Sequence, residues 1–373
     1  MPRTTAVLIA AASGRALAAS ARRGGYTPLV ADFFGDQDTV AAAHAHVRLP
    51  EGLTRGMRCD AVLDALERLA ALREPAGIVC GSGFEDRPEL LIDIARRWRL
   101  LGNEPNVVAR AKDPLVFAQL CADCGIPHPE ISLTRPAEPT GWLVKRRGGA
   151  GGRHVRAAAH CDDAGGTFYF QRRVEGTPVS ALVLADGRRA MVLGFSAQWS
   201  SPAPRQPFRY GGAVQPAVIA RSAADAMFEA VQRIVPMMSL VGLNSVDFLV
   251  DESGIQLLEI NPRPGATLDI FEPKDESIFA MHVAACEGIL PAQAPRFEQA
   301  KASAIVYAER DVAAFPALDW PAWTADRPDA GSSVAEGDPL CTVVACAAGT
   351  ASARALALRR AAMILTMTSA SVA

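Results

Sequence analysis

Carboxylate side chains recur at short spacing in residues 244–265, where two β-rich stretches flank the run Asp-Glu-Ser-Gly. This pattern predicts a β-hairpin. A three-residue loop would place Asp251 opposite Ile255 and, in the same register, Asp247 opposite Glu259. Like charges directly opposite each other destabilise a strand pair unless a counter-charge offsets them. A divalent cation would do so, which makes the hairpin a candidate metal site.

The alternation of side chains along a strand gives the two faces of this hairpin different chemistry. Asn261 falls on the same face as Asp247 and Glu259, and that face is acidic. The other face is predicted to be apolar and to consist of Val246, Phe248, Val250, Leu258 and Ile260. Two carboxylates and an amide oxygen are hard ligands suited to Mg²⁺. Two alternatives stay open: a solvated hairpin whose acids face water, and a one-residue slip that would send the acids to opposite faces.

The sequence around the hairpin resembles the metal-binding end of the ATP-grasp superfamily. The matching motifs are Val-Asp-Phe at 246–248 and Leu-Leu-Glu-Ile-Asn-Pro-Arg-Pro-Gly at 257–265. The continuation through residues 266–291 is most similar to the branch of ATP-dependent carboligases (carboxylate–amine ligases) related to biotin carboxylase. The resemblance implies ATP as cofactor, and one or two Mg²⁺ ions, with Mn²⁺ as a substitute, on the three ligands of the acidic face.

A second stretch, residues 141–152, has the residue types of an anion site. A predicted strand delivers Lys145. Four glycines follow within five residues: Gly148, Gly149, Gly151 and Gly152. Glycines let the backbone bend closely around an anion and point its N–H groups at it, although flexible linkers are also rich in glycine. The resemblance implies a mobile phosphate lid here, with Lys145 as a phosphate contact.

Two positions depart from the family pattern. The family places an Asp-Lys pair before the lid, whereas this sequence has Lys112 followed by Asp113. The resemblance still implies that Lys112 reaches the nucleotide phosphates. Many relatives hold the ribose with a glutamate near position 178, where this chain has Pro178. Either Glu175 or Ser180 substitutes, or the ribose is held less firmly. The residues implied at the adenine hinge are Gln171, Arg172, Val174 and Glu175.

Substrate recognition is assigned to the segment 196–213, which has no regular pattern. Such a segment inside a compact domain is usually functional or disordered. It contains Arg205, Arg209 and Tyr210, and two arginines between aromatic residues suit bidentate contacts to a carboxylate. Packing of the same loop against the surface is the open alternative. A second candidate, Gly81-Ser82-Gly83 behind a predicted strand, is either a tight turn or a part of the substrate pocket.

The elements that must position these residues begin with an α/β pattern. A strand at 6–12, an Ala-rich helix to residue 23 and a strand at 26–32 predict the start of a parallel, Rossmann-like unit. We therefore expect an α/β fold, α+β in parts. The expected domains are a pre-ATP-grasp domain (1–104), an ATP-grasp domain (105–300, with a lid at about 112–174 and a palm at 175–300) and a small β-rich closing domain (301–373).

Composition narrows the class of protein. Lys and Arg number 38 against 40 Asp and Glu, so no nucleic-acid or membrane partner is expected. Eight scattered cysteines favour a reducing compartment, the cytoplasm, over a disulfide framework. No apolar stretch approaches the ~18 residues that span a bilayer. The apolar run at 6–12 is short and interrupted for the core of a signal peptide.

The resemblance implies a ligase that takes a small-molecule carboxylate and an amine. ATP phosphorylates the carboxylate to an acyl phosphate, which the amine attacks to give an amide, ADP and phosphate. Arg263 and Lys145 are the catalytic candidates, because Arg263 is placed to stabilise the charge of the acyl phosphate. Carboligases of this branch resemble enzymes that build amino-acid-bearing coenzymes, so glutamate is the expected amino acid. Three points stay open: a biotin-carboxylase-like enzyme that activates bicarbonate, a non-catalytic ATP-binding regulatory module, and a homodimer.

Overall fold

The chain begins with a parallel α/β unit, as the sequence predicts. The structure is a computed structural model that describes residues 5–50, 52–160 and 166–371. The first sheet has the strand order β3-β2-β1-β4, with every pair parallel. Its strands are β1 (Ala6–Ala10), β2 (Thr27–Asp32), β3 (Ala45–Arg48) and β4 (Ile78–Cys80). The helices of this part are α1 (Arg15–Arg23), α2 (Gln37–Ala42), α3 (Gly52–Arg55), α4 (Cys59–Leu72) and α5 (Pro88–Ala95).

Helices cover both faces of this first sheet. All five residues of β1 are buried, which is typical of a parallel strand covered on both sides. Leu8 and its same-face neighbours pack against α4 and α5, while Val7 and Ile9 pack against α1. The sheet is therefore a rigid support for the chain segments that follow its strands.

An eight-stranded antiparallel sheet forms the centre of the molecule, in the order β13-β12-β9-β10-β11-β14-β16-β15. Its first five strands in the chain are β9 (Thr177–Asp186), β10 (Ala190–Ser200), β11 (Tyr210–Gln215), β12 (Val241–Asp251) and β13 (Gly254–Asn261). The C-terminal strands are β14 (Ala300–Tyr307), β15 (Thr324–Ala325) and β16 (Pro339–Ala347). Because β14 pairs with β11, the predicted closing domain and the predicted palm share one sheet.

Different helices cover the two faces of the central sheet. One face packs against α6 (Pro105–Lys112), α7 (Pro114–Asp123) and α8 (Arg221–Met238). The other face packs against α9 (Leu268–Phe271) and α10 (Ile278–Cys286), in a cluster that continues to α1. The long helix α11 (Thr350–Ser371) packs on β14 and β16. The face covered by α9 and α10 therefore connects the central sheet to the N-terminal unit.

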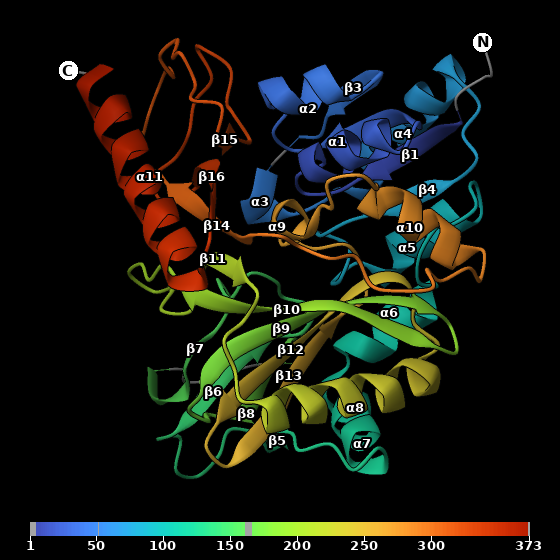
Figure 1. Ribbon diagram of the computed structural model, residues 1–373, viewed down its shortest axis with the longest axis vertical. Coiled ribbons are helices and arrows are strands. Elements are labelled where there is room, and N and C mark those ends of the chain that lie inside the picture. Colours follow the sequence, from blue (N-terminus) through green and yellow to red (C-terminus); the bar gives the residue numbers. More distant parts are fainter. Residues whose placement is uncertain (1–4, 51, 161–165, 372–373) are drawn as a thin grey trace.

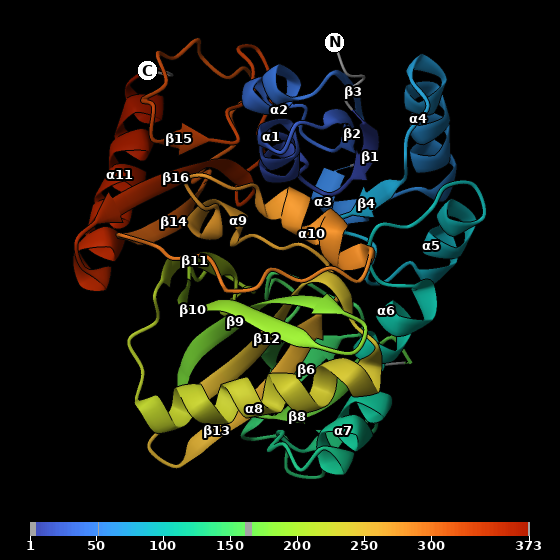
Figure 2. The same cartoon turned by 45° about the vertical axis from the view of Figure 1, so that its right-hand side comes forward.

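A small antiparallel sheet corresponds to the predicted lid. Its strand order is β5-β8-β6-β7. The elements are β5 (Ile131–Ser132), β6 (Trp142–Arg146), β7 (Arg156–Ala157), the 3-10 turn η1 (Ala158–His160) and β8 (Phe168–Arg172). The lid sheet lies at one end of the molecule, and the N-terminal and C-terminal parts lie side by side at the other (Figures 1 and 2).

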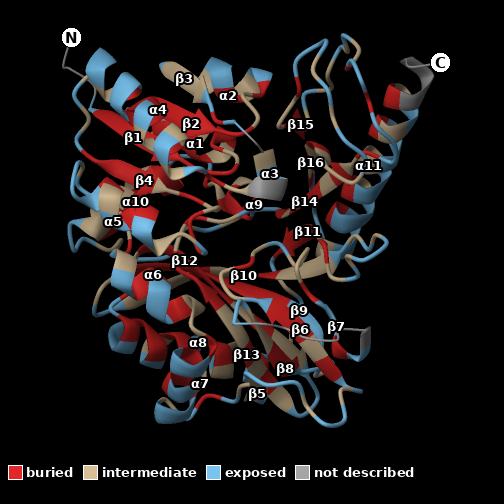
Figure 3. Cartoon of the chain, turned by 180° about the vertical axis from the view of Figure 1, so that it is seen from behind, coloured by how far each residue is buried: buried red, intermediate tan, exposed pale blue. Residues whose placement is uncertain are grey.

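Burial follows this architecture. Figure 3 shows buried residues concentrated along the strands of the N-terminal and central sheets. Helices α4, α8 and α11 carry exposed residues on their outer sides in the same view. Within the part of the chain that the structure describes, no helix combines the length and apolar character needed to cross a membrane.

Candidate active site

The β12–β13 hairpin pairs Asp247 with Glu259, as the sequence predicts. The loop differs from the prediction, because it has two residues instead of three. Asp251 consequently pairs with Gly254 and not with Ile255. A β-bulge on the β13 side adds one residue between the loop and the acidic pair. The two differences cancel, which is why the predicted opposition of the two carboxylates holds.

Because of the bulge, the predicted apolar face of the hairpin is wrong at one residue, Leu258. Phe248 pairs with Leu257 and Asp247 with Glu259, so Leu258 is the extra residue of β13. Leu257, and not the predicted Leu258, is fully buried in the core between the sheet and α8. A bulge re-aims side chains in this way without ending the strand pair.

Three oxygen-bearing side chains converge on the acidic face. The amide Nδ2 of Asn261 donates to Oδ2 of Asp247 over 2.9 Å and to Oε1 of Glu259 over 3.1 Å. The other oxygen of Asp247 accepts from the hydroxyl of Ser180 over 2.5 Å. Among the described residues, no three or more His, Cys, Asp or Glu side chains are grouped so that they could hold a metal ion. The carboxylates of Asp247 and Glu259 fit Mg²⁺, which keeps its other positions for water and phosphate. The Asn261 amide turns its nitrogen toward these carboxylates and its oxygen toward Lys112, so its oxygen would join the carboxylates as a ligand only after the amide rotates.

The two carboxyl groups of the acidic pair have pKa values that are shifted in opposite directions. Burial, followed by repulsion from Glu259, raises the pKa of Asp247. Burial also disfavours the charged form of Glu259, but Lys112, Lys145 and His154 outweigh it and lower the pKa of that carboxyl. A divalent cation beside both groups would favour both charged forms.

Lys112 reaches this cluster in spite of the reversed order of the Lys-Asp pair. Its Nζ donates to Oδ1 of Asn261 over 2.8 Å and lies 3.9 Å from Oε2 of Glu259. Lys112 is the last residue of α6, while Asp113 caps the next helix by accepting from two backbone N–H groups of α7. The Lys-Asp order is consistent with these separate roles, because Lys112 contacts the acidic cluster and Asp113 caps the helix that follows.

Lys145 lies between the lid sheet and the hairpin. It is 7% exposed, and its Nζ donates to Oε1 of Gln171 over 3.1 Å. Burial alone would lower the pKa of Lys145, but Tyr169 and Glu259 raise it above its usual value. The buried Nε2 of Gln171 has no hydrogen-bond partner within the described ranges. A free amide donor therefore accompanies the buried cation on the lid.

The glycine loop fits tightly between two other segments. Gly148, Gly151 and Gly152 have positive φ angles of 67°, 66° and 68°. A Cβ at Gly148 would lie 2.6 Å from the carbonyl oxygen of Glu85, and one at Gly152 would lie 1.9 Å from that of Phe208. Only glycine allows this approach.

A histidine that we did not predict covers the remaining glycine of the loop. A Cβ at Gly149 would lie 2.4 Å from the ring of His154. Burial, opposed by Glu259 and reinforced by Lys145, lowers the pKa of His154 to about 4. The neutral imidazole therefore lies against the glycine loop.

The predicted hinge residues are placed at the end of β8. Arg172 stacks on the ring of Trp142 at 5.7 Å from its centroid. Val174 is partly buried. The carboxylate of Glu175 is 82% exposed and pairs with Arg173 at 3.0 Å. Because Ser180 already donates to Asp247, Glu175 is the freer of the two side chains proposed for the ribose.

Arg263 extends from the end of β13 toward the N-terminal unit. Its Nε donates to Oε1 of Glu85 over 2.7 Å, and its Nη2 lies 3.4 Å from Oδ1 of Asn261. The second oxygen of Glu85 accepts from the N–H of Gly83 over 2.7 Å. Burial opposes the charge of Glu85, but Arg263 and Lys112 keep the pKa of this carboxyl below its usual value. Sequence reasoning missed Glu85, whose one signal is its place directly after the glycine turn behind β4.

The same region contains a small pocket that is open to solvent. Gly81, Glu85, Asn103, Arg263 and His282 are among the residues that line it. Gly81 therefore contributes to a pocket wall next to Arg263.

The three predicted substrate residues separate in the structure. Arg205 is exposed on a turn with a φ of 67°. The guanidinium of Arg209 stacks on Tyr307 at 3.6 Å from the ring centroid and donates to the carbonyl oxygens of Ser201 and Gly337. Arg209 thus supports the C-terminal part of the sheet. Tyr210 packs on the face of the central sheet that also carries the acidic pair.

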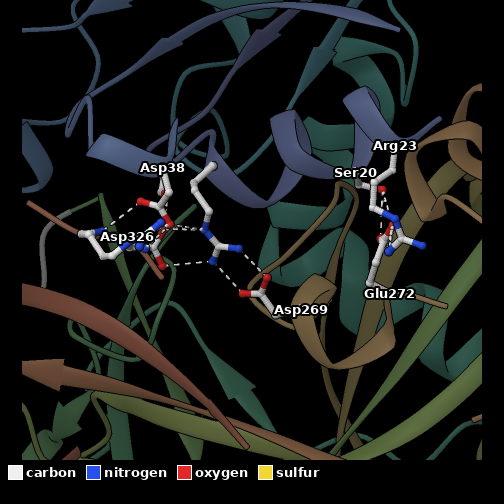
Figure 4. A network of polar contacts seen from close by, with 9 residues as sticks. Ser20, Arg23, Asp38, Asp269, Glu272 and Asp326 are labelled. Carbon is white, nitrogen blue, oxygen red and sulfur yellow. Dashed lines mark hydrogen bonds and ion pairs between the residues drawn. The ribbon is translucent and has the colours of Figure 1, made fainter. Parts of the chain in front are cut away.

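A polar network joins three parts of the chain beside this face (Figure 4). Arg15 at the start of α1 makes two hydrogen bonds to Asp269 of α9. Its Nε donates to Oδ1 of Asp326 over 3.0 Å and lies 3.9 Å from the carboxylate of Asp38. Nothing in the local sequence indicates these contacts, because Asp326 is 311 residues away from Arg15.

Residues 112–267 match the family model of the ATP-grasp domain. This segment is an ATP-grasp domain. ATP together with Mg²⁺ is the cofactor pair of ATP-grasp enzymes. The ATP-grasp domain contains Lys112, Lys145, the glycine loop and the hairpin, whereas Glu85 and Asp269 reach the site from outside it.

Solved structures share the fold of nearly the whole chain. A biotin carboxylase complex from Campylobacter jejuni has a TM-score of 0.72 at 17% identity, over 94% of this chain and 89% of that chain. The N5-carboxyaminoimidazole ribonucleotide synthetase of Thermotoga maritima has a TM-score of 0.69 at 15% identity, over 96% and 98% of the two chains. At these identities the likeness establishes the fold alone, and the predicted arrangement around an ATP-grasp domain is confirmed at that level.

One curated relative is the carbamoyl phosphate synthase large chain of Rubrobacter xylanophilus, which is 22% identical over 237 residues. The match covers 57% of this chain. The chain spans 22% of the length of that relative, so the two differ widely in size.

Proposed function

We propose that the protein is an ATP- and Mg²⁺-dependent ligase that joins a carboxylate to an amine through an acyl phosphate. The observation that carries this proposal is the convergence of Asn261 on Asp247 and Glu259, with Lys112 bonded to the same amide. Oxygen ligands and cations placed side by side suit a metal–triphosphate complex, which needs both.

The residues of the site divide into three roles. Asp247, Glu259 and Asn261 would hold the metal, which neutralises phosphate charge when bound. The cations Lys112 and Lys145, together with the N–H groups of the glycine loop, would align the phosphates. The Gln171 amide that lacks a partner within the described ranges is a further donor on the lid side of the site.

Arg263 is the residue proposed to stabilise the acyl phosphate. Its Nε donates to Glu85, its Nη2 faces Asn261, and its Nη1 faces the carbonyl oxygen of Pro264. A guanidinium fixed on one side leaves its remaining N–H groups available to an oxyanion without reorganisation. No side chain acts as a nucleophile in this scheme.

The proposed reaction has two steps. A carboxylate oxygen attacks the γ-phosphorus of ATP, the bond from γ-phosphorus to the bridging oxygen breaks, and ADP leaves with the electron pair. The amine nitrogen then attacks the acyl carbon, a C–N bond forms, and the C–O bond to phosphate breaks. Phosphate leaves, and the nitrogen gives its surplus protons to solvent. We further propose an amino acid such as glutamate as the amine and a coenzyme precursor as the carboxylate, on the resemblance of this sequence to carboligases.

A second candidate function is the activation of bicarbonate. It is favoured by the fold shared with biotin carboxylase and N5-carboxyaminoimidazole ribonucleotide synthetase. Bicarbonate presents the same carboxylate oxygens to the γ-phosphate as a larger acid does, so the hairpin and Arg263 would serve both reactions.

One experiment separates the candidates. Purified protein is incubated with ATP and Mg²⁺, and phosphate release is measured against libraries of carboxylates and amines, singly and in pairs. The ligase proposal predicts release that requires both a carboxylate and an amine. Release with bicarbonate and biotin in their place would establish the second function, and nucleotide binding without turnover would identify a regulatory module.

A further inference from the structure

The hydroxyl of Tyr210 is a buried donor without a partner among the residues described. The backbone of this residue is held on both sides. Its N–H donates to the carbonyl oxygen of Gly151 in the glycine loop over 3.0 Å, and its carbonyl oxygen accepts from the hydroxyl of Tyr307 over 2.7 Å. A buried hydroxyl that makes no hydrogen bond costs free energy. Because the backbone of Tyr210 is held in place, we expect its hydroxyl to gain a hydrogen-bond partner when a ligand binds.

The hydroxyl belongs to the face of the central sheet that carries the acidic pair. Ser180 of β9 donates to Asp247, and Leu182, two residues on and so on the same face, packs in the apolar cluster that contains Tyr210. Helix α9, which carries Asp269, packs on the same cluster. Tyr210 therefore shares one face with the proposed metal ligands and with the polar network around Arg15.

The charges of two carboxylates act on this hydroxyl. Burial first, and then nearby charges that include those of Asp247 and Asp269, raise the pKa of Tyr210. The phenol therefore stays protonated at neutral pH, as a neutral group close to two acids.

The Arg15 network carries more negative than positive charge. Two guanidiniums face three carboxylates: Arg15 faces Asp269, Asp326 and Asp38, and Arg327 lies 3.9 Å from Asp38 as well. Asp269 accepts from one edge of Arg15, and its carboxylate keeps 18% of its surface exposed. Each carboxylate oxygen can accept a further hydrogen bond. The network thus offers an accessible acceptor on α9, which packs in the same cluster as Tyr210.

We propose that the Tyr210 hydroxyl and the Asp269 carboxylate bind the ammonium group of a cationic primary amine, the second substrate of the proposed ligase. An ammonium has three donors and no acceptor, which suits a phenol oxygen and a carboxylate. An anion at this position would be repelled by the carboxylates of Asp247 and Asp269. The inference rests on the proposed function. It divides the site into a part for phosphate, with Lys112, Lys145 and Arg263, and a part for the amine, with the carboxylate of Asp269.

The test compares a cationic amine with hydroxylamine in one reaction. Hydroxylamine is uncharged at neutral pH and attacks an acyl phosphate to give a hydroxamate, so it needs no ammonium site. The bound ammonium gives one proton to solvent, and the free amine that results attacks the same acyl carbon as hydroxylamine does; phosphate leaves in both cases. The ratio of amide to hydroxamate therefore reports how well the cationic amine is bound, independently of the rate of phosphorylation. Glutamate and other primary amines are each tested against hydroxylamine, with the carboxylate found by phosphate release.

Tyr210→Phe is the decisive variant, because it removes an oxygen that makes no hydrogen bond within the described part of the protein. It should lower the ratio of amide to hydroxamate about 10- to 100-fold, the usual effect of losing a hydrogen bond to a charged group. Tyr26→Phe, in the N-terminal unit, is the matched control and should keep the wild-type ratio. Asp269→Asn should lower the ratio as well. Because Asp269→Asn also breaks the contact with Arg15, its folding is checked by circular dichroism. If Asp269→Asn does not fold, the result for Tyr210→Phe alone decides the test.

The outcomes separate the inference from the function on which it rests. An unchanged ratio in Tyr210→Phe would overturn the ammonium site while leaving the ligase intact. Hydroxamate from the wild type without amide from any cationic amine would overturn it too. A wild type that forms neither product with any carboxylate would overturn the proposed function and this inference together.

Discussion

Arg263 and Glu85 form a buried ion pair between positions 178 residues apart in the chain, with 2.7 Å between Nε and Oε1. The two side chains are 13% and 3% exposed. Glu85 belongs to the loop behind β4, and the glycine loop packs on its backbone. The N-terminal unit thereby fixes the orientation of the arginine that we assign to the acyl phosphate.

Glu85→Gln should lower the turnover number more than it changes the affinity for ATP. A neutral amide holds the guanidinium less firmly, and misplacement of a catalytic group by about 1 Å costs on the order of 100-fold in rate. The measurement is the turnover number for phosphate release beside the dissociation constant of ATP. Glu67→Gln serves as control, since Glu67 pairs with Arg97 at the surface. A loss confined to ATP affinity would contradict the role given to Glu85.

Neighbouring glycines of the lid loop should respond differently to alanine. Gly151 and Gly152 share a positive φ, and that strain costs about 1–2 kcal/mol in either variant. A methyl group at Gly152 would also collide with the carbonyl oxygen of Phe208, whereas nothing lies within 4 Å at Gly151. Gly152→Ala should therefore reduce turnover at least about tenfold further than Gly151→Ala does. Phosphate release and thermal unfolding of the two variants, measured side by side, check this; equal losses would argue against the tight loop.

Stability should fall in acid because of His282. Its Nδ1 accepts from the N–H of Leu243 over 2.8 Å, and Nε2 lies 2.9 Å from the carbonyl oxygen of Leu101. Burial lowers the pKa of His282 to about 4. Since the unfolded chain has a pKa of about 6.5 at this residue, it binds more protons than the folded protein between those values. The contribution of His282 to the free energy of unfolding should therefore decrease as pH falls from about 6.5 to 4, by about 3 kcal/mol over the whole window.

Urea unfolding at several pH values measures this effect, and His282→Gln isolates it from other groups. Burial also raises the pKa of Asp36 to about 8, which favours the folded state as pH falls and so acts in the opposite sense. The difference between wild type and variant removes that contribution. A difference that stays constant between pH 7 and pH 4 would refute the assignment to His282.

The local sequence pattern was sufficient to predict those parts of the site that lie on continuous segments of the chain. The alternation along β12 and β13 predicted the opposition of Asp247 and Glu259, and the glycine run predicted a loop that only glycine can form. The bulge at Leu258 escaped prediction because an extra residue in a strand leaves no mark in a run of apolar side chains. The predicted loop was one residue too long, and this error compensated for the missed bulge, so the predicted pairing of Asp247 with Glu259 was still correct.

Contacts over long stretches of sequence could not be predicted. The pairs Arg263–Glu85 and Arg15–Asp269 depend on how the N-terminal unit docks on the central sheet, and no spacing rule encodes that docking. The stacking partner of Arg209 could not be predicted for the same reason, because Tyr307 lies on a strand that reaches it only in the folded sheet. Hydroxyl groups such as that of Tyr210 become informative only when the structure shows that they lack a partner.

The central claim is that Asp247, Glu259 and Asn261 hold the metal that accompanies ATP. Calorimetric titration with ATP, in excess Mg²⁺ and in EDTA, tests it most directly when wild type is compared with Glu259→Gln and with Glu252→Gln, an exposed glutamate of the same hairpin. We predict that Mg²⁺ tightens ATP binding at least about tenfold in the wild type and in Glu252→Gln. The gain should be absent in Glu259→Gln. An equal gain in all three proteins, or none in the wild type, would contradict the claim.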